Sequence, residues 1–215
     1  MKRNVLLIGA GGHAKNVIEC IDKEKYSIIG ILDKDEDHIH ESVNGIEIIG
    51  TDKNIQYYYD NGVDCAVIAI GHMGMPFVRD RIYRKLKEVG FDLINVQHPT
   101  GYISPSAELK DGIVIMPGVI VNAEARIGSN VILNTRSIIE HEVVVENNVH
   151  IAPGTVIAGA AIIGKNSFIG AGSTVIQGIT IGRNVIIGAG SVIIRDVPDN
   201  TKVVGIPGRE LKENI

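Results

Sequence analysis

Residues 157–186 read IAGAAI IGKNSF IGAGST VIQGIT IGRNVI, which are five blocks of six residues that each begin with Ile or Val. The same frame runs without an insertion from Ile103 to Pro198, and the first residue of every block is aliphatic. The fifth residue is always small or β-branched, and the second is often glycine, as at Gly128, Gly164 and Gly170. This regularity indicates one structural unit that is stacked many times.

A period of six fits neither an amphipathic helix nor a single strand, whose side-chain periods are 3.6 and 2. It fits a chain that turns a corner every six residues, so that short parallel strands form the three flat faces of a prism. One aliphatic side chain per strand then points to the axis. We expect the small fifth residue to let each corner pack and the second-position glycines to tolerate the backbone there. The pattern predicts a parallel β-helix.

The first hundred residues have a different pattern. A buried strand over 4–10 leads into a turn with the spacing G-x-G-x-x-A over Gly9–Ala14 and then into a helix. A second strand over 27–32 ends at Asp33. Such glycines let the backbone approach a phosphate, and an acid about twenty residues later can meet a ribose or a base. A strand-to-helix turn without a ligand is the simpler alternative.

Further strands are expected over 64–71 and 91–96, with a helix over 76–89 between them. NAD binding needs two mononucleotide-binding halves, and this segment has room for one. We therefore predict a Rossmann-like α/β domain over residues 1–98 that binds a single nucleotide. The β-helix domain and its tail follow over residues 99–215, with the boundary near His98–Pro99.

Composition and charge limit the partners. The chain has 25 acidic and 21 basic residues, a net charge of −4 and no long basic run, so nucleic acid is not expected. The apolar run Val5–Ile8 is too short for a signal peptide or a membrane span, which favours a cytoplasmic protein with no membrane partner. Cys20 and Cys65 lie in apolar segments and are expected as buried thiols.

Within the repeat, His141 and the adjacent Glu142 are the strongest candidates for chemistry. The residues one coil before and after His141 are Ala123 and Gly159, so we expect open space around the imidazole. Glu142 can hold one imidazole tautomer and raise its basicity. A solvated surface histidine is the alternative.

The remaining histidines carry weaker signals. His150 lies half a coil beyond His141, so it either meets His141 across a subunit boundary or lines a neighbouring part of one cleft. His13 stands at the start of a helix, which is sufficient to explain its position. For the other four histidines, no group of neighbouring residues indicates a functional role; these are His38, His40, His72 and His98.

Several motifs occur together as they do in one known family. They are the glycine turn, Ile31-Leu32-Asp33, Ala69-Ile70-Gly71, Ile103-Ser104-Pro105-Ser106-Ala107, Leu133-Asn134-Thr135, Ile139-Glu140-His141-Glu142 and His150. Over essentially its whole length the chain resembles the nucleotide-sugar acetyltransferases of the sialic-acid O-acetyltransferase and bacillosamine N-acetyltransferase type, within the hexapeptide-repeat superfamily. The resemblance implies a left-handed β-helix, acetyl-CoA as co-substrate, no metal, and a homotrimer with sites between subunits.

The resemblance also implies roles for individual residues. His141 matches the general base and Glu142 the acid that orients it. His150 matches a histidine that contacts the acetyl group, and the residues that match the lining of the CoA groove are Gly159, Ala171 and Ala189. The residues that match the nucleotide-sugar site are Gly11, Gly12, His13, Asp33, Lys34, Gly71 and Asn134. Lys34 stands where the bacillosamine enzyme has a second acid, so the resemblance does not fix which nucleotide the substrate carries.

The tail Val203–Arg209 resembles the usual ending of these acyltransferases, which closes the last coil near the CoA; an end cap is the plainer alternative. The expected activity is direct N-acetylation of a nucleotide-linked 4-amino sugar. O-acetylation of sialic acid or another sugar is an alternative within the same class. From other classes, a γ-type carbonic anhydrase needs three histidines around a metal, whereas this repeat contains two, His141 and His150. A non-catalytic nucleotide-binding trimeric scaffold is the last alternative.

Overall fold

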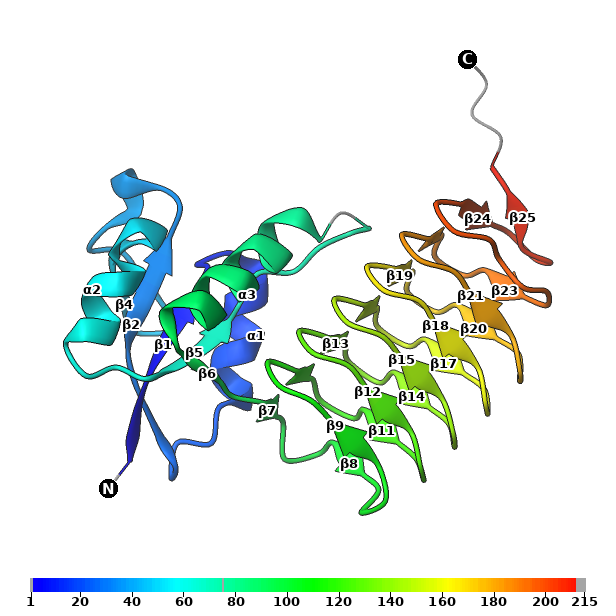
Figure 1. Cartoon of the computed structure of the whole chain (residues 1–215), viewed down its shortest axis with the longest axis horizontal. Helices are drawn as coiled ribbons and strands as arrows, with labels where there is room; N and C mark the ends of the chain where they lie inside the picture. The colour runs from blue at the N-terminus through cyan, green and yellow to red at the C-terminus, as the bar shows by residue number, and fades with distance from the viewer. Residues whose placement is uncertain (1, 75, 212–215) are drawn as a thin grey trace.

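The computed structural model describes residues 2–74 and 76–211, which form an α/β domain and a prism-shaped β-helix (Figure 1). The elements of the α/β domain are β1 (Arg3–Ile8), α1 (Gly12–Cys20), β2 (Tyr26–Asp33), β3 (Ser42–Val43), β4 (Ile46–Thr51), α2 (Ile55–Asp60), β5 (Cys65–Ile68), α3 (Phe77–Val89) and β6 (Asp92–Leu93). Their sheet has the order β3-β4-β2-β1-β5-β6. All neighbours are parallel except β3 and β4, as expected for a Rossmann-like domain.

Alternate residues of β1 fill two separate cores. Leu6 and Ile8 pack with apolar side chains from α2 and α3. Val5 and Leu7 point to the other face of the sheet, where they pack with α1. Because α1 also contacts β7 and β10 of the β-helix, this second core continues into the prism. The α/β domain is therefore fixed against the first coils of the β-helix (Figure 1).

The β-helix has three sheets, which we name after their first strands. The β7 sheet contains β7 (Val96–Gln97), β10 (Val114–Ile115), β13 (Ile132–Leu133), β16 (His150–Ile151), β19 (Phe168–Ile169), β22 (Ile186–Ile187), β24 (Lys202–Val204) and the antiparallel β25 (Arg209–Glu210). The β8 sheet contains β8 (Tyr102–Ile103), β11 (Ile120–Val121), β14 (Ile138–Ile139), β17 (Val156–Ile157), β20 (Thr174–Val175) and β23 (Val192–Ile193). The β9 sheet contains β9 (Glu108–Leu109), β12 (Arg126–Ile127), β15 (Val144–Val145), β18 (Ile162–Ile163) and β21 (Thr180–Ile181).

The predicted period of six sets the register of these sheets. Within the β7 sheet, Ile132 pairs with His150 and His150 with Phe168, each 18 residues apart. The first residue of each block is the second residue of its two-residue strand, and it is buried in every coil from Ile115 to Ile193. The parallel β-helix predicted from the repeat is thus confirmed, together with the left-handed winding that the resemblance implies.

The backbone of the corners differs from the expectation. The glycines at the second position of the block do not have a positive φ; left-handed backbone falls on the fourth position, for example at Glu142 (φ 58°) and Ala160 (φ 56°). The second-position glycines are required for a steric reason, because coils stack closely there. A Cβ on Gly164 would lie 2.6 Å from the Gly182 backbone, and one on Gly170 would lie 2.5 Å from the Ala189 nitrogen.

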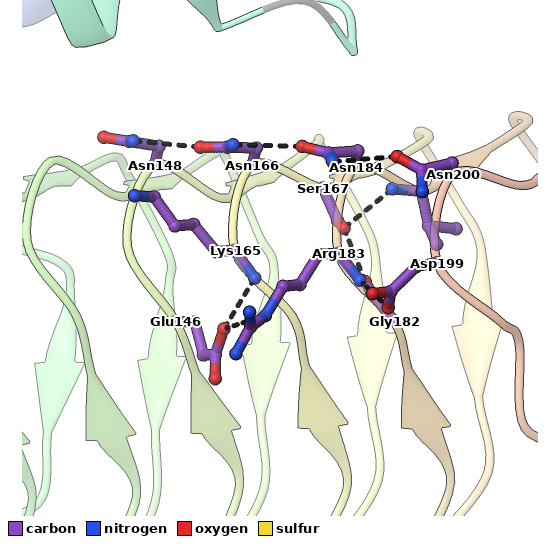
Figure 2. Close-up of polar contacts among 11 residues, drawn as sticks. Glu146, Asn148, Lys165, Asn166, Ser167, Gly182, Arg183, Asn184, Asp199 and Asn200 are labelled. Carbon is purple, nitrogen blue, oxygen red and sulfur yellow. Dashed lines mark hydrogen bonds and ion pairs between the residues drawn. The ribbon is translucent and has the colours of Figure 1, made fainter.

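One corner carries a ladder of asparagines (Figure 2). It leads from the β9 sheet to the β7 sheet, and its left-handed residues are Asn130, Asn148, Asn166, Asn184 and Asn200, after Gly112. Each amide donates to the next one along the prism, at 2.9, 3.0, 3.0 and 2.9 Å. Asn148 also donates to Asp80 of α3 at 2.7 Å, so this asparagine corner helps to hold the α/β domain.

One local expectation needs correction. The predicted strand over 91–96 is wrong, because its two ends form β6 and β7, which belong to different sheets. The sequence patterns also gave no prediction of β3 and β4 or of α2. The helix expected over 76–89 is confirmed as α3. Among residues 2–74 and 76–211, we find no helix that is long and apolar enough to span a bilayer.

Candidate active site

The glycine turn forms one side of a cleft at the carboxyl ends of β1, β2 and β5. Gly9 has φ 106°, and a Cβ there would lie 2.5 Å from Ile70, so the turn requires glycine. Gly11 precedes α1 without a side-chain cap, which leaves the helix N-terminus open to a ligand. The cleft has a volume of about 460 Å³. Most of the residues predicted for the nucleotide-sugar site line this cleft, namely Gly11, Gly12, His13, Asp33, Lys34 and Gly71.

Asp33 has a structural task within the cleft. Its Oδ2 accepts a hydrogen bond from the Ala10 nitrogen at 2.7 Å, and its Oδ1 lies 3.4 Å from the nitrogen of Asp35. The carboxylate therefore fixes the glycine turn in addition to any contact with a ribose. Lys34 is exposed at the rim of the cleft, near Asp52 and Arg81, which lie 4.0 Å apart.

A buried guanidinium that sequence reasoning missed lies at the inner end of the cleft. Arg79 of α3 is 1% exposed, and it donates to the carbonyls of Ile68 and Ile70 at 2.7 and 2.8 Å. From the β-helix it reaches the carbonyls of Gly112 and Asn130, both at 3.3 Å. Burial lowers the pKa of Arg79 to about 9, so the side chain stays charged at neutral pH. It ties the floor of the cleft to the first coils.

Three histidines gather beside Arg79, where the α/β domain meets the β7 sheet. We call His13, His72 and His150 the imidazole cluster. The rings of His72 and His150 meet edge to face at 5.2 Å, and His150 has the same relation to Phe168. His72 was not expected to have a constellation, and this expectation is wrong: the side chain is 8% exposed and lines the cleft.

All three imidazoles are neutral at physiological pH. Burial, with Arg79 and His150 adding to it, lowers the pKa of His13 to about 3. Burial is also the main cause that lowers the pKa of His72 to about 3. The backbone of Asn148 acts in the opposite direction and raises the pKa of His72. Neither ring nitrogen of His72 makes a hydrogen bond with a described residue. For His150 burial lowers the pKa to about 4, against the effect of its bond to the His72 carbonyl.

His150 uses both of its ring nitrogens. Its Nδ1 lies 2.6 Å from the His72 carbonyl oxygen, and this fixes the proton on Nδ1 because a carbonyl can only accept. Its Nε2 therefore accepts the hydrogen bond from the Asn134 side-chain nitrogen at 3.1 Å. The Oδ1 of Asn134 in turn accepts from the Thr135 nitrogen at 2.8 Å. The structure thus brings together Asn134 and His150, which the sequence had placed in different parts of the site.

His141 lies on another corner, which leads from the β8 sheet to the β9 sheet. Its Nδ1 is 3.0 Å from Oε2 of Glu142, and the two side chains are 61% and 60% exposed. A Cβ on Gly159 would lie 2.5 Å from Nε2 of His141. The expected open space is therefore absent on this side, because the imidazole itself fills it. On the other side Ala123 is exposed. We call this region the His141 corner.

The predicted CoA-groove residues divide between two corners. Gly159 belongs to the His141 corner, whereas Ala171 and Ala189 are exposed on the corner from the β7 sheet to the β8 sheet, which also carries Asn134. We call the latter the Asn134 corner. The tail closes the last coil, because β24 pairs with β22 and the Gly208 nitrogen donates to the Val192 carbonyl. Within residues 2–74 and 76–211, no three His, Cys, Asp or Glu side chains are placed to hold a metal ion.

Comparison with known families matches both parts of the chain. Residues 4–86 match the family described as the PglD N-terminal domain. Residues 124–159 and 160–195 match the bacterial transferase hexapeptide family (six repeats).

Similar solved structures cover nearly the full length. A histidine-to-alanine mutant of GDP-perosamine N-acetyltransferase from Caulobacter crescentus, in complex with CoA and GDP-perosamine, is 34% identical with a TM-score of 0.92 over 98% of this chain and 97% of that chain. The acetyltransferase domain of PglB from Neisseria gonorrhoeae, in complex with acetyl coenzyme A, is 34% identical with a TM-score of 0.89 over 98% and 100%. WeeI from Acinetobacter baumannii is 25% identical with a TM-score of 0.82 over 98% and 100%.

The chain belongs to the hexapeptide-repeat nucleotide-sugar acetyltransferases. It is therefore an acyltransferase, and its co-substrate is acetyl-CoA. The individual roles assigned to residues of this acetyltransferase, from His141 to the glycines of the cleft, stay predictions.

Proposed function

We propose that this acetyltransferase transfers the acetyl group of acetyl-CoA to the amino group of a nucleotide-linked 4-amino sugar. The observation that carries the proposal is the His141–Glu142 pair, whose imidazole packs over Gly159 at an otherwise repetitive corner. The nucleotide-type cleft of the α/β domain supports it, and so does the likeness to an enzyme that acts on GDP-perosamine.

His141 has the geometry of a general base. The Glu142 carboxylate accepts from Nδ1–H, which leaves Nε2 unprotonated and able to take a proton. The sugar amine attacks the thioester carbonyl, a C–N bond forms and the C–S bond breaks. His141 takes the proton from the amine nitrogen and passes it to the departing CoA sulfur. No covalent acyl-enzyme is required, and both cysteines are buried in the α/β domain.

The negative charge that develops on the carbonyl oxygen needs a hydrogen-bond donor. The N–H of Gly159 makes no hydrogen bond with any residue in 2–74 or 76–211, and a Cβ on the same residue would lie 2.5 Å from Nε2 of His141. A fixed backbone donor of this kind stabilises an oxyanion without reorganisation. Gly159 thus serves the reaction in two ways, by making room for the base and by supplying the donor.

We further propose a homotrimer that completes the site. The outward side chains of the β8 sheet are uncharged and mostly apolar: Tyr102, Ile120, Ile138, Val156, Thr174 and Val192. Solenoid faces of this kind associate. With three β8 sheets around one axis, the His141 corner of each copy faces the Asn134 corner of the next. The exposed His141 then meets a nucleotide sugar held by a neighbouring copy.

The test is acetyl-CoA turnover with a panel of UDP-, GDP- and dTDP-linked 4-amino sugars. Each is paired with the matching 4-hydroxy sugar nucleotide, and free sialic acid is included. We expect release of free CoA with one amino sugar and little with its hydroxyl partner. Faster turnover of a hydroxyl acceptor would favour the O-acetyltransferase alternative, and no turnover with any acceptor would favour the scaffold. Light scattering, or sedimentation, measures whether the protein is a trimer.

A further inference from the structure

The imidazole cluster contains hydrogen-bonding groups with no partner. Both ring nitrogens of His72 and the Nε2 of His13 are shielded from solvent and make no hydrogen bond with any described residue. Buried polar atoms are paired in nearly all native structures, so each such exception calls for a reason. His150 provides the contrast, because both of its nitrogens are bonded.

The protonation state of the cluster limits what can pair with it. A neutral imidazole offers one N–H donor and one lone-pair acceptor. The pKa of His72 and that of His13 are lowered to about 3 by burial, so neither ring carries charge at neutral pH. A hydroxyl or an amine matches this pattern because it can both donate and accept. A phosphate, which only accepts, matches it less well, and the uncapped backbone N–H groups at the N-terminus of α1 are donors that suit that group.

The position of His72 indicates which part of a substrate it meets. It follows Gly71 at the end of β5 and lines the same cleft as the glycine turn. Its carbonyl accepts a hydrogen bond from His150, whose other nitrogen bonds to Asn134 at the Asn134 corner. The cluster therefore spans the distance between the nucleotide cleft and the Asn134 corner. In a nucleotide sugar, the part between the diphosphate and the reacting amine is the hexose ring.

We infer that His72, together with His13, binds the hexose of the nucleotide-linked substrate and so determines which sugar this enzyme accepts. The inference rests on the proposed function and adds a binding residue to it. Because the His72 nitrogens are shielded, binding turns the ring so that at least one nitrogen faces the sugar. The backbone bond from His150 keeps the loop in place during that rotation.

Equilibrium binding without acetyl-CoA tests the inference. Isothermal titration compares UDP, GDP and dTDP with their 4-amino-sugar derivatives, for the unmodified protein and for His72→Phe. Phenylalanine keeps an aromatic ring beside His150 and Phe168 but has no nitrogen. We expect the variant to bind the preferred amino-sugar nucleotide about tenfold more weakly, because the sugar loses its partner. Affinity for the free nucleoside diphosphate should change less than twofold.

Two further variants keep the result interpretable. His72→Gln restores one donor and one acceptor, so it should recover part of the lost affinity. His38→Phe removes an exposed histidine that does not line the cleft, and it should bind like the parent chain. Equal loss of affinity for sugar nucleotide and free diphosphate in His72→Phe, or no loss for either, would overturn the inference alone. If no sugar nucleotide binds the unmodified protein, the proposed function fails as well.

Discussion

The asparagine corner and the His141 corner are built on the same backbone turn, with a left-handed residue at the fourth position of each block. At the asparagine corner the same residue type fills this position in four successive coils, and Asn200 continues the row beyond the last block, so that each amide bonds to the next (Figure 2). At the His141 corner the equivalent residues are Glu124, Glu142, Ala160 and Gly178, which are of three different types.

The difference shows how a repeat divides its tasks. Each asparagine in the ladder forms a hydrogen bond with the identical residue in the next coil, so a uniform asparagine corner stabilises the fold. The His141 corner has no ladder, and its side chains are free to differ from coil to coil. Changes at the asparagine corner should therefore alter stability without altering chemistry, and changes at the His141 corner should do the reverse.

The largest expected effect is that of His141→Ala. Removing a general base should lower kcat about 10³-fold, while the Kd for acetyl-CoA and the midpoint of thermal unfolding stay nearly constant because the side chain is exposed. Release of free CoA, calorimetric titration and a thermal scan measure the three quantities. Full activity in this variant would remove His141 from the mechanism.

Gly159→Ala is expected to act almost as strongly on the same corner. The new methyl group occupies the place of the His141 ring, so the imidazole must turn away and kcat should fall about 10²-fold. Ala160→Gly is the matched control, since glycine is at ease at its φ of 56°, and it should keep kcat within about twofold. A Gly159→Ala enzyme as fast as the control would show that the imidazole position is unimportant.

At the asparagine corner, Asn166→Ala should show the opposite signature. It breaks two ladder bonds and places alanine at a φ of 66°, so we expect the free energy of unfolding to fall by about 2 kcal/mol. Asn166→Gly loses the bonds without the backbone strain and should lose about 1 kcal/mol. Urea denaturation measures both losses. A change in kcat comparable to that of Gly159→Ala would contradict the division between the corners.

Much of the fold was accessible from sequence because the period of six is a local pattern. The axis-facing residue of each strand and the helix α3 follow directly from it or from similar local periodicity. The reason for glycine at Gly164 was not accessible, since it depends on the distance to a residue in the next coil. The strand expected over 91–96 failed because an apolar run does not show that its two ends enter different sheets.

The site divides in the same way. His141 and Glu142 are neighbours in sequence, so their pairing was predictable. The imidazole cluster and Arg79 combine residues far apart in the chain and from both domains, and no local motif connects them. One signal pointed there: Val114, Ile132, His150 and Phe168 are outward positions of the β7 sheet, and their aromatic or apolar character indicates that something covers this sheet.

The covered β7 sheet extends the comparison between the corners, because its histidines couple stability to pH. In the unfolded chain His72 titrates near 6.5, whereas in the folded chain its pKa is about 3. Between these values the unfolded state binds a proton that the folded state does not. The contribution of His72 to the free energy of unfolding is therefore fully present above pH 6.5 and is lost as the pH falls toward 3. The loss for one such histidine is about 1.4 kcal/mol per pH unit.

His72→Phe and His72→Gln both remove this titration despite their different polarity. Urea denaturation between pH 7 and pH 5 should therefore show the same shallower pH dependence for both variants, and an unchanged slope would mean that His72 is accessible to protons in the folded chain.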